Sequence, residues 1–196
     1  MTTSPITTAD QLKPVLSRLA DVVDGVSEQR LDAQTPCHDW DVAALRDHVA
    51  RWLTTFADGY ADPDGKAPDA SALSVEPTGA TVRAAAAKLD EAVRSGAGDR
   101  ALWLGQSSMP GDMALSMILW EYVVHGWDLA RGTGQDWRPN GGAVDASLEF
   151  APGMLSPDYQ GEGKAFAPRV DIPKDAPSLD RLLGLSGRDP SWLPER

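Results

Sequence analysis

The segment Met113–Ala130, MALSMILWEYVVHGWDLA, decides the fold that we expect for this chain. Its apolar residues recur at helical spacing, which predicts a largely buried helix over about residues 112–131. Glu121 and His125 lie four residues apart, so both side chains project from one face of this helix, about 6 Å apart along its axis. Because a buried charge without a partner is costly, Glu121 needs a cation or strong hydrogen bonds. The carboxylate and the imidazole can bind one cation together.

The amphipathic segment Asp41–Phe56, DVAALRDHVARWLTTF, is the expected partner of this helix. Asp41 is a suitable N-cap, and His48 lies among the apolar positions of the segment. If the two helices pack side by side, His48 completes a three-residue set with Glu121 and His125. Three protein ligands on zinc leave a fourth position for water or substrate. The sequence therefore predicts a metal site of the catalytic type.

Four further helices are expected, over about residues 8–26, 81–94, 143–151 and 178–185. Thr8 and Gln11 are spaced as a capping box for the first helix, although Pro14 favours a regular part that begins nearer Lys13. No segment has convincing strand periodicity, and Ala165–Ile172 is the nearest candidate. Residues 58–80 predict a long surface loop, which either shapes a pocket mouth or connects distant helix ends.

We expect residues 1–196 to form a single domain. Residues 1–155 would form a helical bundle, and residues 156–196 a C-terminal arm that packs along it as an extended segment with a short helix. Gly184 or Gly187 is expected to end that helix. The apolar anchors of the arm are expected to be Leu182, Leu183, Leu185 and Trp192.

Composition narrows the classes of function. The net charge of −11 argues against nucleic acid or an anionic membrane as a partner. No apolar run approaches the length of a membrane span, and the N-terminus MTTSPITTAD has no features of a signal peptide, so a cytoplasmic location is expected. The single cysteine, Cys37, excludes an internal disulfide framework and a thiolate-rich zinc site. A monomer and a homodimer are both open.

Two motifs resemble a known family. Residues 35–48 (TPCxxWxVxxLxxH) and 121–130 (ExxxHGWDLA) are similar to the DinB-like metal-binding superfamily. The nearest resemblance is to the mycothiol-dependent maleylpyruvate isomerase N-terminal domain and its single-domain relatives, whose C-terminal ends resemble residues 166–188. The resemblance implies an all-α, up-down-down-up four-helix bundle that binds a divalent metal, usually zinc. Carried over by position, the ligands are His48, Glu121 and His125.

The resemblance also implies a function. The expected protein is a zinc-dependent enzyme of the mycothiol S-transferase or isomerase type, which activates a low-molecular-weight thiol toward an electrophilic substrate. The isomerase that it resembles has a second domain, which this chain is too short to include. Thiol chemistry on the bundle alone is therefore expected rather than maleylpyruvate isomerisation. The alternative is a non-catalytic, metal-containing binding or stress-related protein.

Other polar residues near the motifs have simpler interpretations. His38 lies in a connector and is expected to be a surface or turn residue. Cys37 is expected to be a small buried packing group rather than a nucleophile. Asp128 shares a helical face with His125, and we expect it to orient a ligand or to make a structural hydrogen bond. Without the resemblance, Glu121 and His125 would more often form a buried hydrogen-bonded pair than bind a metal.

Overall fold

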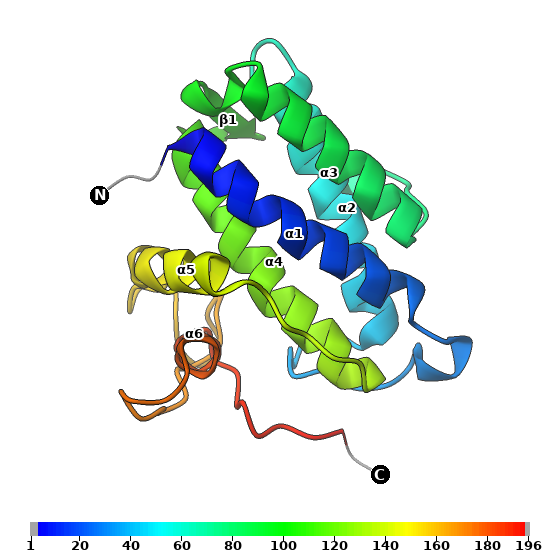
Figure 1. The fold of residues 1–196 in the computed structure, drawn as a ribbon, viewed down its shortest axis with the longest axis vertical. Coiled ribbons are helices and arrows are strands. Elements are labelled where there is room, and N and C mark those ends of the chain that lie inside the picture. The colour runs from blue at the N-terminus through cyan, green and yellow to red at the C-terminus, as the bar shows by residue number, and fades with distance from the viewer. Residues whose placement is uncertain (1–3, 195–196) are drawn as a thin grey trace.

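The computed structural model describes residues 4–194 and is mostly helical (Figure 1). Within this range, the four long helices are α1 (Pro5–Asp24), α2 (Val42–Ala61), α3 (Gly79–Arg94) and α4 (Gly111–Thr133). Both α3 and α4 pack against α1 and against α2, so each long helix has two long neighbours. The shorter α5 (Gly141–Met154) packs on α4, and α6 (Ser178–Leu185) packs on α5. No helix in this range is long and apolar enough to cross a bilayer.

A small hairpin corrects the expectation of an all-α chain. Strands β1 (Ala101–Leu104) and β2 (Ser107–Pro110) pair antiparallel, with Leu104 opposite Ser107. Gly105 makes the tight turn with a φ of +63°, which glycine adopts without steric penalty. Strands of four residues are too short for a clear alternation of apolar and polar positions. The nearest candidate strand from sequence contributes only an isolated bridge, between Gln160 and Phe166.

Helix α1 corrects a second expectation, because it begins at Pro5 and continues through Pro14. Thr8 lies inside the helix and is buried, so it forms no capping box with Gln11. Pro14 lacks the N–H that would bond to the carbonyl of Asp10, but both residues face solvent, where water can hydrate that carbonyl. The apolar stripe on the opposite face of α1 is buried on both sides of the proline.

Polar side chains cap the start of three of the α-helices. Asp41 accepts a hydrogen bond from the Ala44 backbone N–H at 2.8 Å, which confirms it as the N-cap of α2. Thr78 and Asn140 do the same for α3 and α5. Three short 3₁₀ helices lie between the longer elements: η1 (Glu28–Arg30), η2 (Ala70–Ala72) and η3 (Ala97–Asp99). The loop before α3 runs beside the hairpin, where the Ala67 backbone N–H donates to the carbonyl of Trp103, and it connects the end of α2 to the start of α3.

The C-terminal segment is tied to the helices at several points. Helix α6 has the predicted bounds, and Gly187 rather than Gly184 follows it as the terminator, with a φ of +79°. The Arg188 backbone N–H donates to the Leu183 carbonyl at 2.9 Å and closes the turn. Of the expected anchors, Leu182 and Leu183 are fully buried, whereas Leu185 and Trp192 are partly buried.

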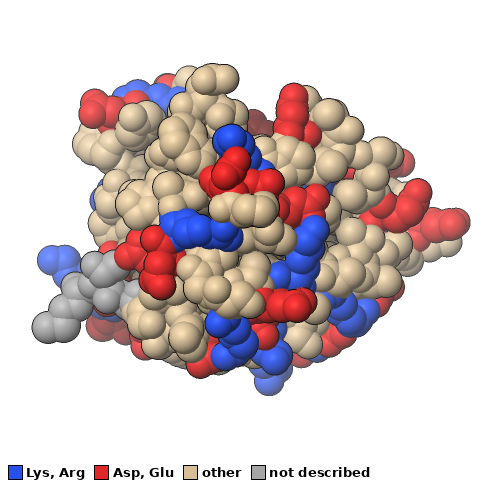
Figure 2. Space-filling view, turned by 90° about the horizontal axis from the view of Figure 1, so that it is seen from above, with Lys and Arg blue, Asp and Glu red and all other residues tan. Residues whose placement is uncertain are grey.

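Charged side chains of both signs are mixed on the face seen in Figure 2. Arg83 bonds Asp21 and Asp24, and Arg94 bonds Asp10 and Asp90, so two basic residues of α3 hold α1 against it. These pairs are largely exposed and contribute little stability each. The apolar core between the long helices therefore supplies most of the stability; its largest fully buried side chains include Leu16, Leu19, Leu45, Leu53, Phe56, Leu115, Ile118, Leu119 and Tyr122.

Candidate metal site

Helices α2 and α4 pack side by side and bring the three predicted ligand residues together. His48 lies on α2, whereas Glu121 and His125 lie on α4. One donor atom from each residue lies within 4.8 Å of the other two. The Nε2 atom of His48 is 3.1 Å from Oε1 of Glu121, and the two imidazole centroids are 5.2 Å apart. Glu121 therefore has a partner on the neighbouring helix.

A cavity of about 480 Å³ opens beside these residues. Their side chains are 12–19% exposed, so a small molecule in the cavity could reach them. The helices contribute one wall, with Met117, Trp120 and Val124 of α4. The C-terminal segment contributes another part of the lining, through residues 161–168 and 186–188. From the sequence, this segment was expected to pack along the helices but not to line the site.

Trp40 covers one side of the cluster. Its ring centroid is 4.2 Å from that of His48, with an interplanar angle of 31°, and 5.5 Å from that of His125. The connector before α2 folds around the Thr35 hydroxyl, which donates to the Trp40 carbonyl at 2.7 Å and accepts from the Cys37 backbone N–H at 3.2 Å. These bonds fold residues 35–40 so that the Trp40 ring lies against His48, a contact that was not predicted from the sequence.

Asp128 contacts the other side of His125. Its Oδ2 atom is 3.1 Å from Nδ1 of His125, which leaves Nε2 of that ring as the other possible donor atom. Asp128 also accepts hydrogen bonds from Arg188, at 3.0 Å from Nη2 and 3.3 Å from Nε. The Asp128 side chain is completely buried, and that of Arg188 is only 10% exposed. Asp128 thus lies where an orienting carboxylate was expected, and Arg188 is an additional partner.

The ionisation of this group follows from its burial and charges. Burial lowers the pKa of His125 below its usual value even though Asp128 opposes the shift. The neutral imidazole, which is the metal-binding form, is therefore favoured near neutral pH. Burial alone would raise the pKa of Asp128, but the Arg188 guanidinium and His125 together hold it below its usual range. Asp128 is therefore a carboxylate that can accept hydrogen bonds from both neighbours.

A second group of possible ligands, Cys37, His125 and Asp128, shares His125 with the first. Burial raises the pKa of the Cys37 thiol to about 11, so the thiolate that binds metals is scarce near neutral pH. Arg188 already supplies a positive charge to Asp128. These two facts favour the set with His48 and Glu121. Cys37 is buried, as expected, and His38 is an exposed turn residue outside both groups.

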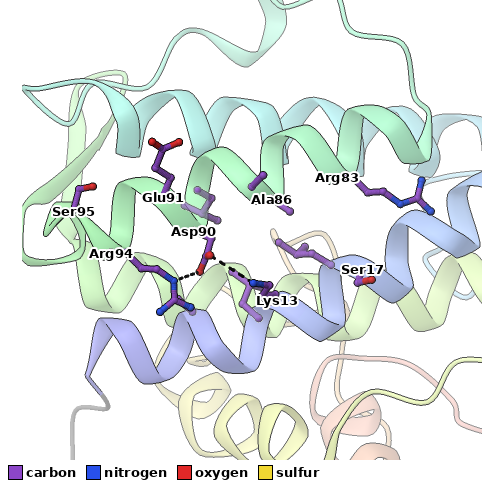
Figure 3. Close-up of a pocket in the computed structure, with 13 residues that line it drawn as sticks. Lys13, Ser17, Arg83, Ala86, Asp90, Glu91, Arg94 and Ser95 are labelled. Atoms are coloured by element: carbon purple, nitrogen blue, oxygen red, sulfur yellow. Dashed lines mark hydrogen bonds and ion pairs between the residues drawn. The ribbon is translucent and has the colours of Figure 1, made fainter.

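A separate cavity, of about 550 Å³, lies between α1 and α3 (Figure 3). Asp90 on its rim pairs with Arg94 at 3.0 Å and with Lys13 at 3.9 Å. Its lining includes apolar side chains such as Leu12 and Leu16, but neither histidine nor cysteine. The charged groups on its rim mainly satisfy one another, so we assign no chemistry to it.

The fold and the candidate metal site together define a helical protein in which two histidines and a glutamate cluster between adjacent helices. The chain belongs to the mycothiol maleylpyruvate isomerase N-terminal domain family, whose sequence pattern matches residues 12–130. The match includes His48, Glu121 and His125, and it ends before α5.

Two proteins of Mycobacterium tuberculosis are similar to most of the chain. They are Uncharacterized protein Rv0738 of strain ATCC 25618 / H37Rv and Uncharacterized protein MT0763 of strain CDC 1551 / Oshkosh. Each is 28% identical over 177 residues, which cover 86% of this chain and 91% of the relative. No solved structure matches the chain at a significant level.

Proposed function

We propose that the protein is a zinc-dependent enzyme that activates mycothiol, or a similar low-molecular-weight thiol, toward an electrophilic substrate in S-transfer or isomerisation. The observation that carries this proposal is the convergence of His48, Glu121 and His125 beside a cavity of about 480 Å³ in a member of this family. The pairwise packing of α1 to α4 is consistent with a DinB-like four-helix bundle, for which the family resemblance implies an up-down-down-up topology.

The donor set fits a catalytic zinc ion. Two imidazole nitrogens and one carboxylate oxygen are ligand types that zinc takes, and three protein ligands would leave a coordination position for a molecule in the cavity that these residues line. When bound, zinc would lower the pKa of a coordinated thiol, so that the thiolate predominates near neutral pH. The predicted cytoplasmic location agrees with this chemistry, because the cytoplasm keeps thiols reduced.

The residues of the chain would hold the reactants in place. Asp128 orients His125 through Nδ1, and Trp40 shields one face of His48 from water. Trp120 and Phe166, whose ring centroids are 5.6 Å apart, form an apolar wall for the carbon skeleton of a substrate. Because Cys37 is buried and protonated near neutral pH, the attacking sulfur would come from the external thiol.

A non-catalytic binding or stress-related protein is the second candidate. The observation that favours it is the direct contact of His48 with Glu121 at 3.1 Å, which partly satisfies the carboxylate without a cation. On this alternative, the cluster serves stability or ligand capture, and the cavity binds its ligand without turnover.

Metal analysis and thiol binding test the proposal together. We expect about one zinc ion per purified chain, and we expect added mycothiol to raise the melting temperature. Calorimetry in buffers of different ionisation enthalpy should detect proton release at neutral pH, because the bound form is the thiolate. Zinc without any thiol response would support the binding-protein alternative, and absence of metal affinity would overturn the metal assignment.

A further inference from the structure

A buried ion pair joins the C-terminal segment to α4. Arg188 follows α6 and bonds both carboxylate oxygens of Asp128, which lies 60 positions earlier in the chain. Asp128 has no exposed side-chain surface. Its Oδ2 atom is shared between the Arg188 guanidinium and Nδ1 of His125. One carboxylate thus connects the arm, residues 156–196, to a candidate metal ligand.

The position of Arg188 is itself fixed. Its Nη1 atom donates to the Ser186 carbonyl at 2.7 Å. The Ser186 hydroxyl accepts from the indole N–H of Trp120 at 3.0 Å, so this part of the arm is held on the same helix that carries His125. At Gly187, a Cβ atom would lie 2.8 Å from that of Ala167, and the φ is +79°. Glycine is therefore required to turn the chain so that Arg188 points inward.

Loss of the guanidinium would leave Asp128 as a buried charge with only a neutral imidazole beside it. Removing one partner of a buried ion pair is strongly destabilising, because the charge of the other partner is then uncompensated. The Asp128 side chain would turn away or the local packing would open, and either change removes the hydrogen bond that sets the orientation of the His125 ring. Partners of this kind behind a ligating histidine commonly affect metal affinity.

We propose that Arg188 is a positioning residue that holds His125 in its metal-binding orientation through Asp128, so that docking of the arm and binding of the metal are coupled. The inference rests on the metal site in the proposed function and adds to it a residue outside the range that the family pattern matches. Coupling between two equilibria is reciprocal. Metal should therefore tighten the docking of the arm, and loss of the Arg188 contact should weaken metal binding.

Zinc affinity, measured by competition with a chromophoric chelator, tests the positioning role. For Arg188→Met we expect binding about 10- to 100-fold weaker than for the wild type. Arg188→Lys keeps the charge and should recover part of the loss. The matched control is Arg169→Met. Arg169 also attaches the arm to the helical part, through a hydrogen bond to the Leu155 carbonyl at 2.9 Å, but it makes no hydrogen bond to Asp128. The zinc affinity of this variant should stay within about threefold of the wild type, because the contacts of Arg188 with Asp128 and of Asp128 with His125, which carry the coupling, are left intact.

Three further measurements separate positioning from general destabilisation. Cobalt-substituted Arg188→Met should have a visible absorption spectrum different from that of the wild type, whereas Arg169→Met should not. Asp128→Asn should weaken zinc binding similarly. Adding Arg188→Met to Asp128→Asn should cause little further loss of zinc affinity, because both substitutions break the same connection between Arg188 and His125. Hydrogen exchange at residues 178–192 should slow when zinc binds to the wild type.

The outcomes distinguish this inference from the proposed function. If the wild type binds zinc and Arg188→Met binds it equally tightly with an unchanged cobalt spectrum, the positioning role is wrong and the metal site stands. Additive losses in the double variant would also overturn it. If the wild type has no zinc affinity, the proposed function fails, and this inference fails with it.

Discussion

His48 and His125 belong to one cluster but are held in different ways. His48 stacks against Trp40 and contacts Glu121, and both partners lie on elements close to the cavity. His125 is more deeply buried and is oriented by Asp128. At the scale of single residues, the candidate ligands thus have specific partners in addition to apolar packing.

Substituting His48 by alanine tests the ligand assignment. We expect His48→Ala to remain folded and helical but to bind zinc at least about tenfold more weakly, because one of three donors is lost. His38→Ala is the matched control, since His38 lines the same cavity but lies outside the cluster. Chelator competition on the two variants measures the effect. Equal zinc affinity in His48→Ala and the wild type would show that the assignment is wrong.

Alkylation of Cys37 tests its predicted inertness. The thiol is buried, and burial raises its pKa to about 11, so the thiolate fraction at pH 8 is small. We expect iodoacetamide to label the native protein at pH 8 at least about tenfold more slowly than the unfolded chain, whose thiol has a pKa of about 8.5. Mass spectrometry follows the single adduct. Comparable rates in the two states would contradict both the burial and the pKa shift.

At the scale of elements, α2, α4 and the arm together form the site, with His48 on α2. Helix α4 carries Glu121, His125 and Asp128, and the arm brings Arg188 and one cavity wall. The short helix α6 anchors this wall because its apolar side chains enter the core beside α5. Stability of α6 should therefore matter for the shape of the cavity as well as for the fold.

Leu183→Ala measures how firmly α6 is anchored. Leu183 is fully buried, so its truncation should cost about 2–5 kcal/mol and lower the melting temperature by several degrees or more. Leu193→Ala is the control, because Leu193 is 71% exposed and its loss should change stability by no more than about 0.5 kcal/mol. Thermal unfolding by circular dichroism compares them. Equal melting temperatures would mean that the arm is only loosely attached.

At the scale of the whole molecule, folding places ionisable groups where their proton affinities change. Burial lowers the pKa of His125 in the folded protein. As the pH falls, the unfolded chain, in which a histidine has an ordinary pKa of about 6.5, therefore binds a proton at this residue before the folded protein does. The contribution of His125 to the free energy of unfolding is therefore complete above about pH 6.5, and it is lost as the pH falls toward the pKa of His125 in the folded state. The pKa of Asp128 is also lowered, so its contribution is present above its unfolded value of about 3.9 and is lost at more acidic pH.

Denaturant unfolding of chelator-treated protein at pH 7.5 and pH 5.5 tests this dependence. We expect lower stability at pH 5.5, because the unfolded state binds more protons in this interval. His125→Gln should reduce the difference between the two pH values, since the buried imidazole is its expected source. If the wild type and His125→Gln lose the same amount of stability, another group causes the effect.

Several features could be predicted from particular residues. Apolar periodicity placed α2, α3, α4 and α6, and the side chain of Asp41 identified the start of α2. The start of α1 could not be predicted from Pro14, because the exposure of the proline, rather than its presence, decides whether the helix continues. The hairpin was missed because its strands are only four residues long and have no clear period.

By itself, the sequence determined the helical character of the chain and the spacing of Glu121 and His125, because both depend on residues within a few positions of one another. Only the tertiary structure decided that His48 meets Glu121, that Trp40 covers His48, and that Arg188 reaches Asp128. These contacts join segments far apart in the chain. The spacing of apolar residues along the chain does not predict these contacts, because they depend on how whole elements pack around a common core.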